Sequence, residues 1–183
     1  MDLALNQCGV GTSFNYPELP MSPSTHNSPP DNFTFRVYAC PLPFPLTFAA
    51  HTYVTLEHDS HTDRYEVIPI LGVRKLSRTG HVHQNLLAPE TGFRYLGKYP
   101  FNFGPRYKVR CCGEVIAERG SDVEKLYLFI QSGGLEKYPY KSTYTMVGGP
   151  NSNTFTQWLV DMVPDSKITL PWNAWGKKYK VKK

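Results

Sequence analysis

The segment from Gly148 to Val163 constrains the fold most, because it predicts where a helix begins and which of its faces is buried. The Gly148-Gly149-Pro150 run turns the chain sharply, since glycine tolerates positive φ and proline fixes its own φ at a helix start. Large apolar side chains then recur at i, i+3, i+4 and i+7, namely Phe155, Trp158, Leu159 and Met162. This pattern predicts a helix with one buried face, preceded by a short strand-like piece at residues 143–147.

Asn151, Ser152 and Asn153 stand where this helix begins. Side chains of both types accept hydrogen bonds from the backbone N–H groups that the first turn leaves unpaired. The start of a helix is also the positive end of its dipole, which suits a nucleophile or an anion. An ordinary capped helix has the same appearance, so the cluster is compatible with both a functional site and a plain cap.

Alternating patterns upstream predict a sheet. Strands are expected at residues 33–40, 48–57, 64–71 and 107–117, the last bulged at Gly113, with shorter candidates at 81–83 and 93–96 and a turn at 59–63. Ser121 and Glu124 form a capping box that begins a second helix, which Gly133-Gly134 ends. A run of strands followed by two main helices predicts the α+β class with a mostly antiparallel sheet.

Composition divides the chain into three parts. Residues 1–32 are a Pro-rich N-terminal extension, residues 33–176 a single α+β domain, and residues 177–183 a Lys-rich tail. The net charge of +5 belongs to the tail, which holds five of the 20 basic residues and leaves as many basic as acidic residues in the body. A solvated tail is therefore expected, without specific nucleic-acid binding. Trp172 and Trp175 are expected to anchor the C-terminus to the core.

Cysteine and histidine spacing gives no metal or cofactor expectation. The four cysteines lack CxxC spacing and indicate reduced thiols in a cytoplasm-like compartment. No apolar run reaches transmembrane length, and no secretory signal pattern opens the chain, so the location stays open. His81 and His83 would share one strand face, a workable zinc pair, but no second pair has a known spacing to them. A second group, His58 and His61 with Asp59 and Asp63, is typical of solvated turns.

Several short motifs of the C-terminal half occur together in one known family. They are Tyr138-Pro139-Tyr140, the run Gly149-Pro150-Asn151-Ser152-Asn153-Thr154-Phe155, and Leu170-Pro171, with His51-Thr52-Tyr53-Val54 and Arg64-Tyr65-Glu66-Val67 upstream. In these motifs the chain resembles a bacterial domain-of-unknown-function family, DUF3750. That resemblance implies a shared fold over roughly residues 34 to 179 and carries no activity with it.

The order of these motifs is also similar to that of circularly permuted papain-like proteins of the NlpC/P60 type. The comparison implies that His51 occupies the position of the catalytic base and Ser152 the position where those enzymes carry the cysteine nucleophile. Glu66, Asn151 or Asn153 would then orient the imidazole. The candidate catalytic residues are therefore His51, Ser152, Asn151 and Asn153. One hypothesis is a hydrolase or acyltransferase acting on amide or ester bonds. The other is a non-catalytic protein that binds an unknown substrate or protein partner in the same groove, and the distance between Ser152 and His51 discriminates between them.

Overall fold

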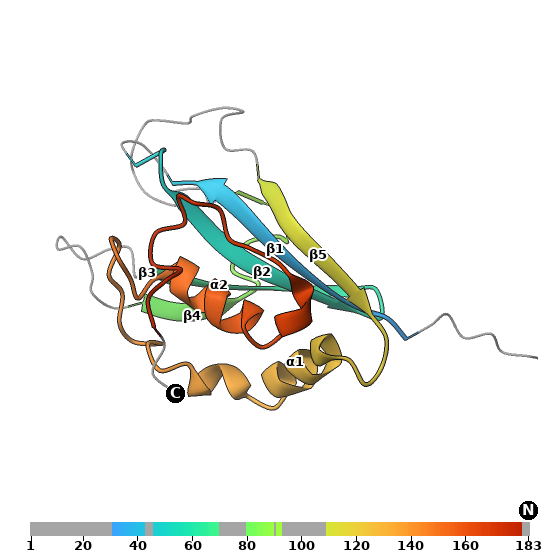
Figure 1. Cartoon of the computed structure of the whole chain (residues 1–183). Coiled ribbons are helices and arrows are strands. Elements are labelled where there is room, and N and C mark those ends of the chain that lie inside the picture. Colours follow the sequence, from blue (N-terminus) through green and yellow to red (C-terminus); the bar gives the residue numbers. More distant parts are fainter. Residues whose placement is uncertain (1–30, 43–45, 70–79, 90, 93–108, 181–183) are drawn as a thin grey trace, which may run out of the picture.

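The computed structural model describes residues 31–42, 46–69, 80–89, 91–92 and 109–180, in which an antiparallel sheet packs against two helices (Figure 1). The strands are β1 (Phe33–Pro41), β2 (Ala50–His58), β3 (His61–Pro69), β4 (Gly80–Gln84) and β5 (Arg110–Ala117), and they lie side by side in the order β4-β3-β2-β1-β5. The helices are α1 (Asp122–Gln131) and α2 (Ser152–Val160), accompanied by the short 3-10 turns η2 (Gly134–Lys137) and η3 (Pro164–Ser166). The predicted α+β class with an antiparallel sheet and two main helices is confirmed.

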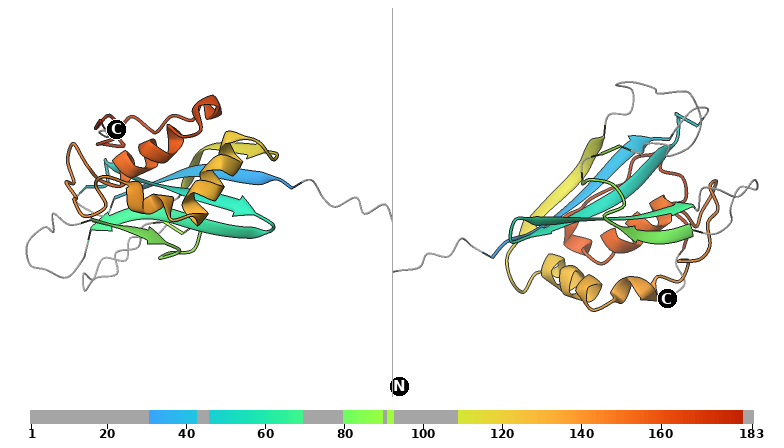
Figure 2. Two further views of the ribbon diagram at one scale, coloured as in Figure 1. Left: turned by 90° about the horizontal axis from the view of Figure 1, so that it is seen from below. Right: turned by 180° about the vertical axis from the view of Figure 1, so that it is seen from behind.

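Side chains alternate along each strand, so the sheet has two distinct faces. Both helices pack against one of them, which we call the core face (Figure 2). The core face is apolar and includes Phe33, Phe35, Val37, Ala50, Val54, Leu56, Tyr65 and Val67, which pack with Leu126, Phe155 and Leu159 of the helices. The opposite side, which we call the polar face, carries Arg36, Tyr38, His51, Tyr53, Thr55, Arg64 and Glu66.

The hairpin between β2 and β3 is tighter than the predicted turn at residues 59–63. Asp59 and Ser60 alone make the connection, with φ angles of 49° and 64°. Two successive positive φ angles give a turn whose twist matches that of the flanking strands, so pairing resumes at once with His58 opposite His61.

The predicted bulge of β5 is present next to Gly113. Gly113 pairs with Val37 and Cys111 with Tyr38, which leaves Cys112 as the extra residue. A Cβ atom at Gly113 would lie 2.8 Å from Cγ1 of Ile168, so only glycine lets the segment after η3 approach the sheet this closely.

Helix α1 begins at the predicted cap. The Ser121 side chain accepts a hydrogen bond from the backbone N–H of Glu124 at 3.2 Å. The Glu124 carboxylate accepts from the N–H of Gly120 at 2.6 Å and not from that of Ser121, so the reciprocal bond closes one residue earlier than a standard capping box. Val123, Leu126 and Ile130 form its buried stripe, as predicted.

Helix α2 is shorter than the apolar pattern suggested. Phe155 and Leu159 are fully buried, whereas Trp158 is only half-buried and Met162 lies beyond the last helical residue, Val160. The predicted strand-like piece at residues 143–147 is wrong, because these residues form turns and irregular chain.

The predicted anchoring role of Trp172 is also wrong, since that side chain is 83% exposed. Trp175 is half-buried and its ring lies 5.3 Å from that of Phe48. Residues 1–30, the strand candidate at 93–96, residues 107–108 and the end of the tail at 181–183 lie outside the described residues. Of the helices within the described ranges, none is long and apolar enough to cross a membrane.

Candidate functional site

The start of α2 is capped by Asn151. Its Oδ1 accepts hydrogen bonds from the backbone N–H groups of Asn153 at 3.0 Å and Thr154 at 3.3 Å. In return, Thr154 Oγ1 accepts from the N–H of Asn151 at 3.2 Å. Two of the N–H groups that could have received an anion in this turn are therefore bonded to the cap.

The two asparagines also join distant segments of the chain. Asn151 Nδ2 donates to the carbonyls of Met146 and Trp175, each at 3.0 Å. Asn153 Nδ2 donates to the carbonyls of Ala50 at 2.9 Å and Trp175 at 2.7 Å. These bonds fix the helix start against β2 and the C-terminal segment.

Ser152 is buried beside Tyr144, with only 3% of its surface exposed. Burial raises the pKa of Tyr144 to about 12, and a hydrogen bond with the Ser152 side chain partly opposes that rise. The hydroxyl predicted to be a nucleophile is thus engaged with a phenol inside the protein.

His51 belongs to the polar face, whereas α2 packs on the core face. Its Nε2 lies 2.8 Å from Oε2 of Glu66. The next residue, Thr52, points the other way and donates to Asn153 Oδ1 at 2.9 Å. Because successive side chains on a strand point to opposite faces, the sheet separates the His51 ring from the helix start. The structure brings Asn151, Ser152 and Asn153 together and places His51 apart from them.

The polar face contains a buried ionic network of Arg64, Glu66 and His51. Arg64 Nη2 donates to the same Oε2 of Glu66, at 2.8 Å. Burial raises the pKa of Glu66, but its bonds and charge interactions with His51 and Arg64 outweigh burial and hold that pKa below its ordinary value. Glu66 is therefore ionised and can only accept, so His51 Nε2 carries the proton between them.

Tyr53 lies within this network. Arg64 Cζ sits 3.5 Å from the centre of the Tyr53 ring, and the Tyr38 ring stacks at 5.3 Å. Burial raises the pKa of Tyr53, so the phenol is neutral at physiological pH. In the part of the chain that the structure describes, three buried polar atoms here have no hydrogen-bond partner: Tyr53 Oη, Arg64 Nε and Glu66 Oε1.

A pocket of about 470 Å³ opens on the polar face next to the network. It is lined by Arg36, Tyr38, Thr55, Glu57, Thr62, Ala88, Pro89 and Thr91. Arg64 holds one wall in place, because its Nη1 donates to the carbonyls of Ala88 at 3.1 Å and Thr91 at 2.5 Å.

Arg36, at the pocket lining, sits between two carboxylates. Its Nη1 donates to Glu57 at 2.5 Å and its Nε to Glu114. Burial lowers the pKa of Arg36, but the two glutamates raise it further, so the guanidinium stays charged. One positive and two negative charges therefore gather at this side of the pocket.

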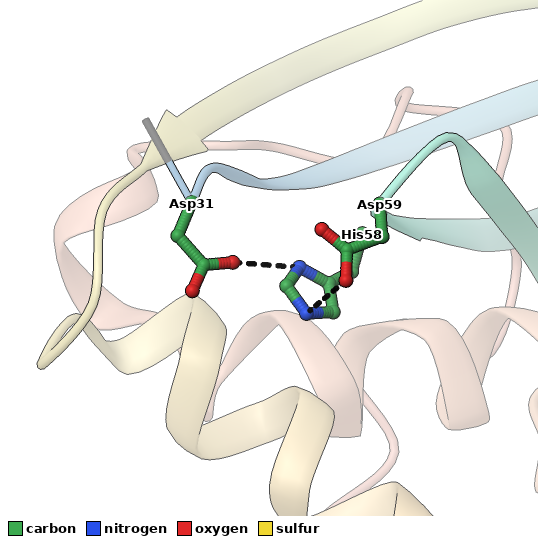
Figure 3. Close-up of side chains that lie close together, drawn as sticks. All are labelled: Asp31, His58 and Asp59. Atoms are coloured by element: carbon green, nitrogen blue, oxygen red, sulfur yellow. Dashed lines mark ion pairs between the residues drawn. The ribbon is translucent and has the colours of Figure 1, made fainter. Parts of the chain in front are cut away.

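The histidines considered as metal ligands fall into separate places. His58 lies between two carboxylates, with Nδ1 3.5 Å from Asp31 and Nε2 3.3 Å from Asp59 (Figure 3). Ligand atoms of these three residues lie within 4.8 Å of one another. Each carboxylate faces a different ring nitrogen, however, and Asp31 also pairs with Arg119, so the two carboxylates do not converge on one point (Figure 3).

The remaining histidines lie at two other places, one on the β2–β3 hairpin and one on β4. His61 Nε2 contacts Asp63 at 3.2 Å on the β2–β3 hairpin. His81 and His83 share one face of β4, with ring centres 6.2 Å apart. Burial lowers the pKa of His83, and the Glu66 charge partly opposes that effect.

Of the three residues that the sequence offered to orient His51, the structure places Glu66 at its Nε2. Arg64 was not predicted as the third member of this network, although a signal for it exists. Arg64 and Glu66 alternate with Tyr65 and Val67, which places two opposite charges on one face of a strand. On the neighbouring strand β2, His51, Tyr53 and Thr55 alternate in the same way, so their shared face lies beside that of Arg64 and Glu66.

Fold and site together define an α+β domain with an antiparallel sheet, two helices on one face and a buried ionic network on the opposite face. The chain belongs to the family described as "Protein of unknown function (DUF3750)", which matches residues 32–179. No curated protein and no solved structure shows a significant match to it. The family resemblance is confirmed, and the papain-like relationship stays a prediction.

Proposed function

We propose that the protein is a non-catalytic binding protein that takes a small polar ligand in the pocket of the polar face. The observation that carries this proposal is the buried network of Arg64, Glu66 and His51 beside that pocket. Perturbed ionisable groups next to a cavity are typical of functional sites.

The network is costly to the fold. Arg64 and Glu66 have no exposed surface, and His51 is only 1% exposed. Burial costs each ion roughly several kcal/mol of hydration free energy, which its pairing must recover. Well-packed apolar residues would serve stability equally well. Three buried polar atoms left without a partner add to this cost, since such atoms are rare in proteins. Binding is a reason for a protein to keep them.

The pocket lining favours a ligand that donates hydrogen bonds. Arg36 is already bonded to Glu57 and Glu114, so an anion would have to compete with both carboxylates. Glu57 and the threonine hydroxyls of the lining instead offer acceptors to an amine or to hydroxyl groups. The volume of about 470 Å³ falls in the range of small-ligand sites.

Three sugars that differ in charge test the proposal by calorimetric titration of the full chain: glucosamine, glucose and gluconate. Glucosamine should bind most tightly and gluconate most weakly. Thr62→Trp should fill the pocket and abolish binding, whereas Thr169→Trp, an exposed position outside the pocket, should leave it unchanged. Two results would reject this site: gluconate that binds as tightly as glucosamine, or no heat of binding up to about 10 mM glucosamine. At that concentration only binding free energies weaker than about 3 kcal/mol escape detection.

Acyl transfer by Ser152 and His51 is the competing proposal. In its favour, Ser152 opens a helix and Glu66 holds the His51 imidazole as the third member of a triad does. Against it, His51 belongs to the polar face of the sheet, whereas α2 with Ser152 packs on the core face. A fluorophosphonate should therefore leave Ser152 unmodified between about pH 5 and pH 9, and labelling that disappears in His51→Ala would instead support the enzyme.

A further inference from the structure

We propose that His81, His83 and Glu66 bind a zinc ion on the polar face of the sheet, at the edge formed by β4. This site lies outside the pocket lining, and it does not depend on the ligand proposed above.

The strand register places the three side chains on one surface. Glu66 pairs directly with His83 across β3 and β4, and Ile68 pairs with His81. Directly paired residues point to the same face, with Cβ atoms about 5 Å apart. His81 and His83 are two positions apart, so they share that face, and their rings meet edge to face at 6.2 Å.

Glu66 supplies the second and independent observation. Its side chain is completely buried, and Oε1 has no hydrogen-bond partner while Oε2 receives both His51 and Arg64. A buried carboxylate oxygen without a partner is expensive, and a cation bound beside His83 would satisfy it. His51 and Arg64 would then hold the carboxylate in place, as outer partners do in metal sites.

The donor set suits zinc. Two imidazoles and one carboxylate are a known three-ligand set for Zn²⁺, which leaves a fourth position to water, whereas Mg²⁺ and Ca²⁺ prefer oxygen ligands. His81 is exposed and His83 half-buried, so an ion would pass these two rings to reach the buried Glu66. The positive charge of Arg64 opposes the ion, and we expect weaker binding than at a structural zinc site.

Side-chain rotation is needed to close the site. Among the described residues, the ligand atoms already within 4.8 Å of one another are those of Asp31, His58 and Asp59. His81 and His83 must turn their rings toward Glu66 to bring nitrogens to about 2.0–2.1 Å from zinc, and their exposure leaves room for that rotation.

Titration of the chelator-treated full chain with Zn²⁺, followed by calorimetry, and with Co²⁺, followed by its visible absorption, tests this site. One equivalent should bind, with the intense bands of four-coordinate cobalt. His81→Asn and His83→Asn should each raise the Kd at least tenfold, since the loss of even an outer partner costs roughly 10–100-fold in metal affinity. Matched variants at the other histidines, His58→Asn and His61→Asn, should leave the Kd unchanged.

Two outcomes would overturn the proposal: no stoichiometric binding by the wild-type chain, or a Kd that His81→Asn and His83→Asn leave unchanged. Both histidines are at the surface, so the two variants should keep the wild-type circular dichroism and melting temperature in the absence of metal. A failed sugar titration with intact zinc binding would reject the ligand pocket alone.

Discussion

Thr52 and Asn153 share a hydrogen bond of 2.9 Å between Oγ1 and Oδ1, although 101 positions separate them in the sequence. The bond fixes the face that β2 turns toward α2. Since neighbouring side chains on a strand point in opposite directions, it also commits His51 to the other face. Two neighbouring residues of β2 therefore serve different sides of the sheet: Thr52 holds the start of α2, and His51 belongs to the polar face to which we assign binding.

Asn153→Ala should destabilise the domain by about 3 kcal/mol. The substitution leaves the carbonyl of Ala50 and the hydroxyl of Thr52 buried without their partner, and each such loss costs roughly 1–3 kcal/mol. Urea denaturation measures the change. Gln157→Ala on the outer side of the same helix, which loses only an exposed bond to Asp161, should stay within about 0.5 kcal/mol of wild type. Equal effects of the two variants would show that Asn153 is no tie between helix and sheet.

The sequence predicts the elements well where a pattern is local. Alternation finds β1 and β2, and capping residues find the start of α1, because both depend on near neighbours along the chain. The bulge at Gly113 is predictable for the same reason.

The site is less predictable, because it depends on which face of β2 meets the helices. Both faces of β2 carry polar side chains, with Thr52 on one and His51 on the other, so polarity alone does not choose between them. Papain-like order places His51 opposite Ser152, whereas in the structure its imidazole contacts the Glu66 carboxylate on the polar face. The burial of Trp158 is hard to predict for a similar reason. Helical periodicity gives the face of α2 that carries Trp158, but not how far the sheet extends beneath that helix.

Phe155→Ala should cost about 3–5 kcal/mol, and Trp158→Ala clearly less. Phe155 is fully buried in the core, whereas Trp158 is half-buried and packs at the margin against the rings of Phe129 and Tyr138. The cost of such truncations follows the apolar surface lost and the cavity left behind. Denaturant titrations of both variants give the comparison, and a larger loss for Trp158→Ala would place the core boundary further out along α2.

Gly176→Ala should be much more damaging than Gly120→Ala. Both glycines have positive φ, 94° and 84°, so alanine is strained by about 1–2 kcal/mol at either position. At Gly176 the added Cβ would also lie 2.6 Å from Oδ1 of Asn151, the cap of α2, whereas at Gly120 it meets nothing within 4 Å. We expect a total loss of roughly 3–4 kcal/mol for Gly176→Ala. Similar melting temperatures for the two variants would contradict the tight contact between the C-terminal segment and the helix cap.

Glu66→Gln should cost about 3–5 kcal/mol at neutral pH, because it leaves the buried Arg64 without its counter-ion.

The stability lost in Glu66→Gln should depend on pH in a defined direction. Burial raises the pKa of Glu66, but His51 and Arg64 lower it more, to below the ordinary value of 4.5. A carboxyl group whose pKa falls on folding stabilises the protein fully above the unfolded value, and that contribution disappears as pH falls through the folded pKa. The difference in unfolding free energy between wild type and Glu66→Gln should therefore be constant above about pH 5 and shrink on acidification below the ordinary pKa. Other carboxyl groups with lowered pKa values, such as Asp63, titrate in both proteins and cancel in this difference. Denaturant titrations at a series of pH values test it, with Glu57→Gln as the half-exposed control. A difference that stays constant down to pH values where the fold is lost would mean that Glu66 is not ionised in the native network.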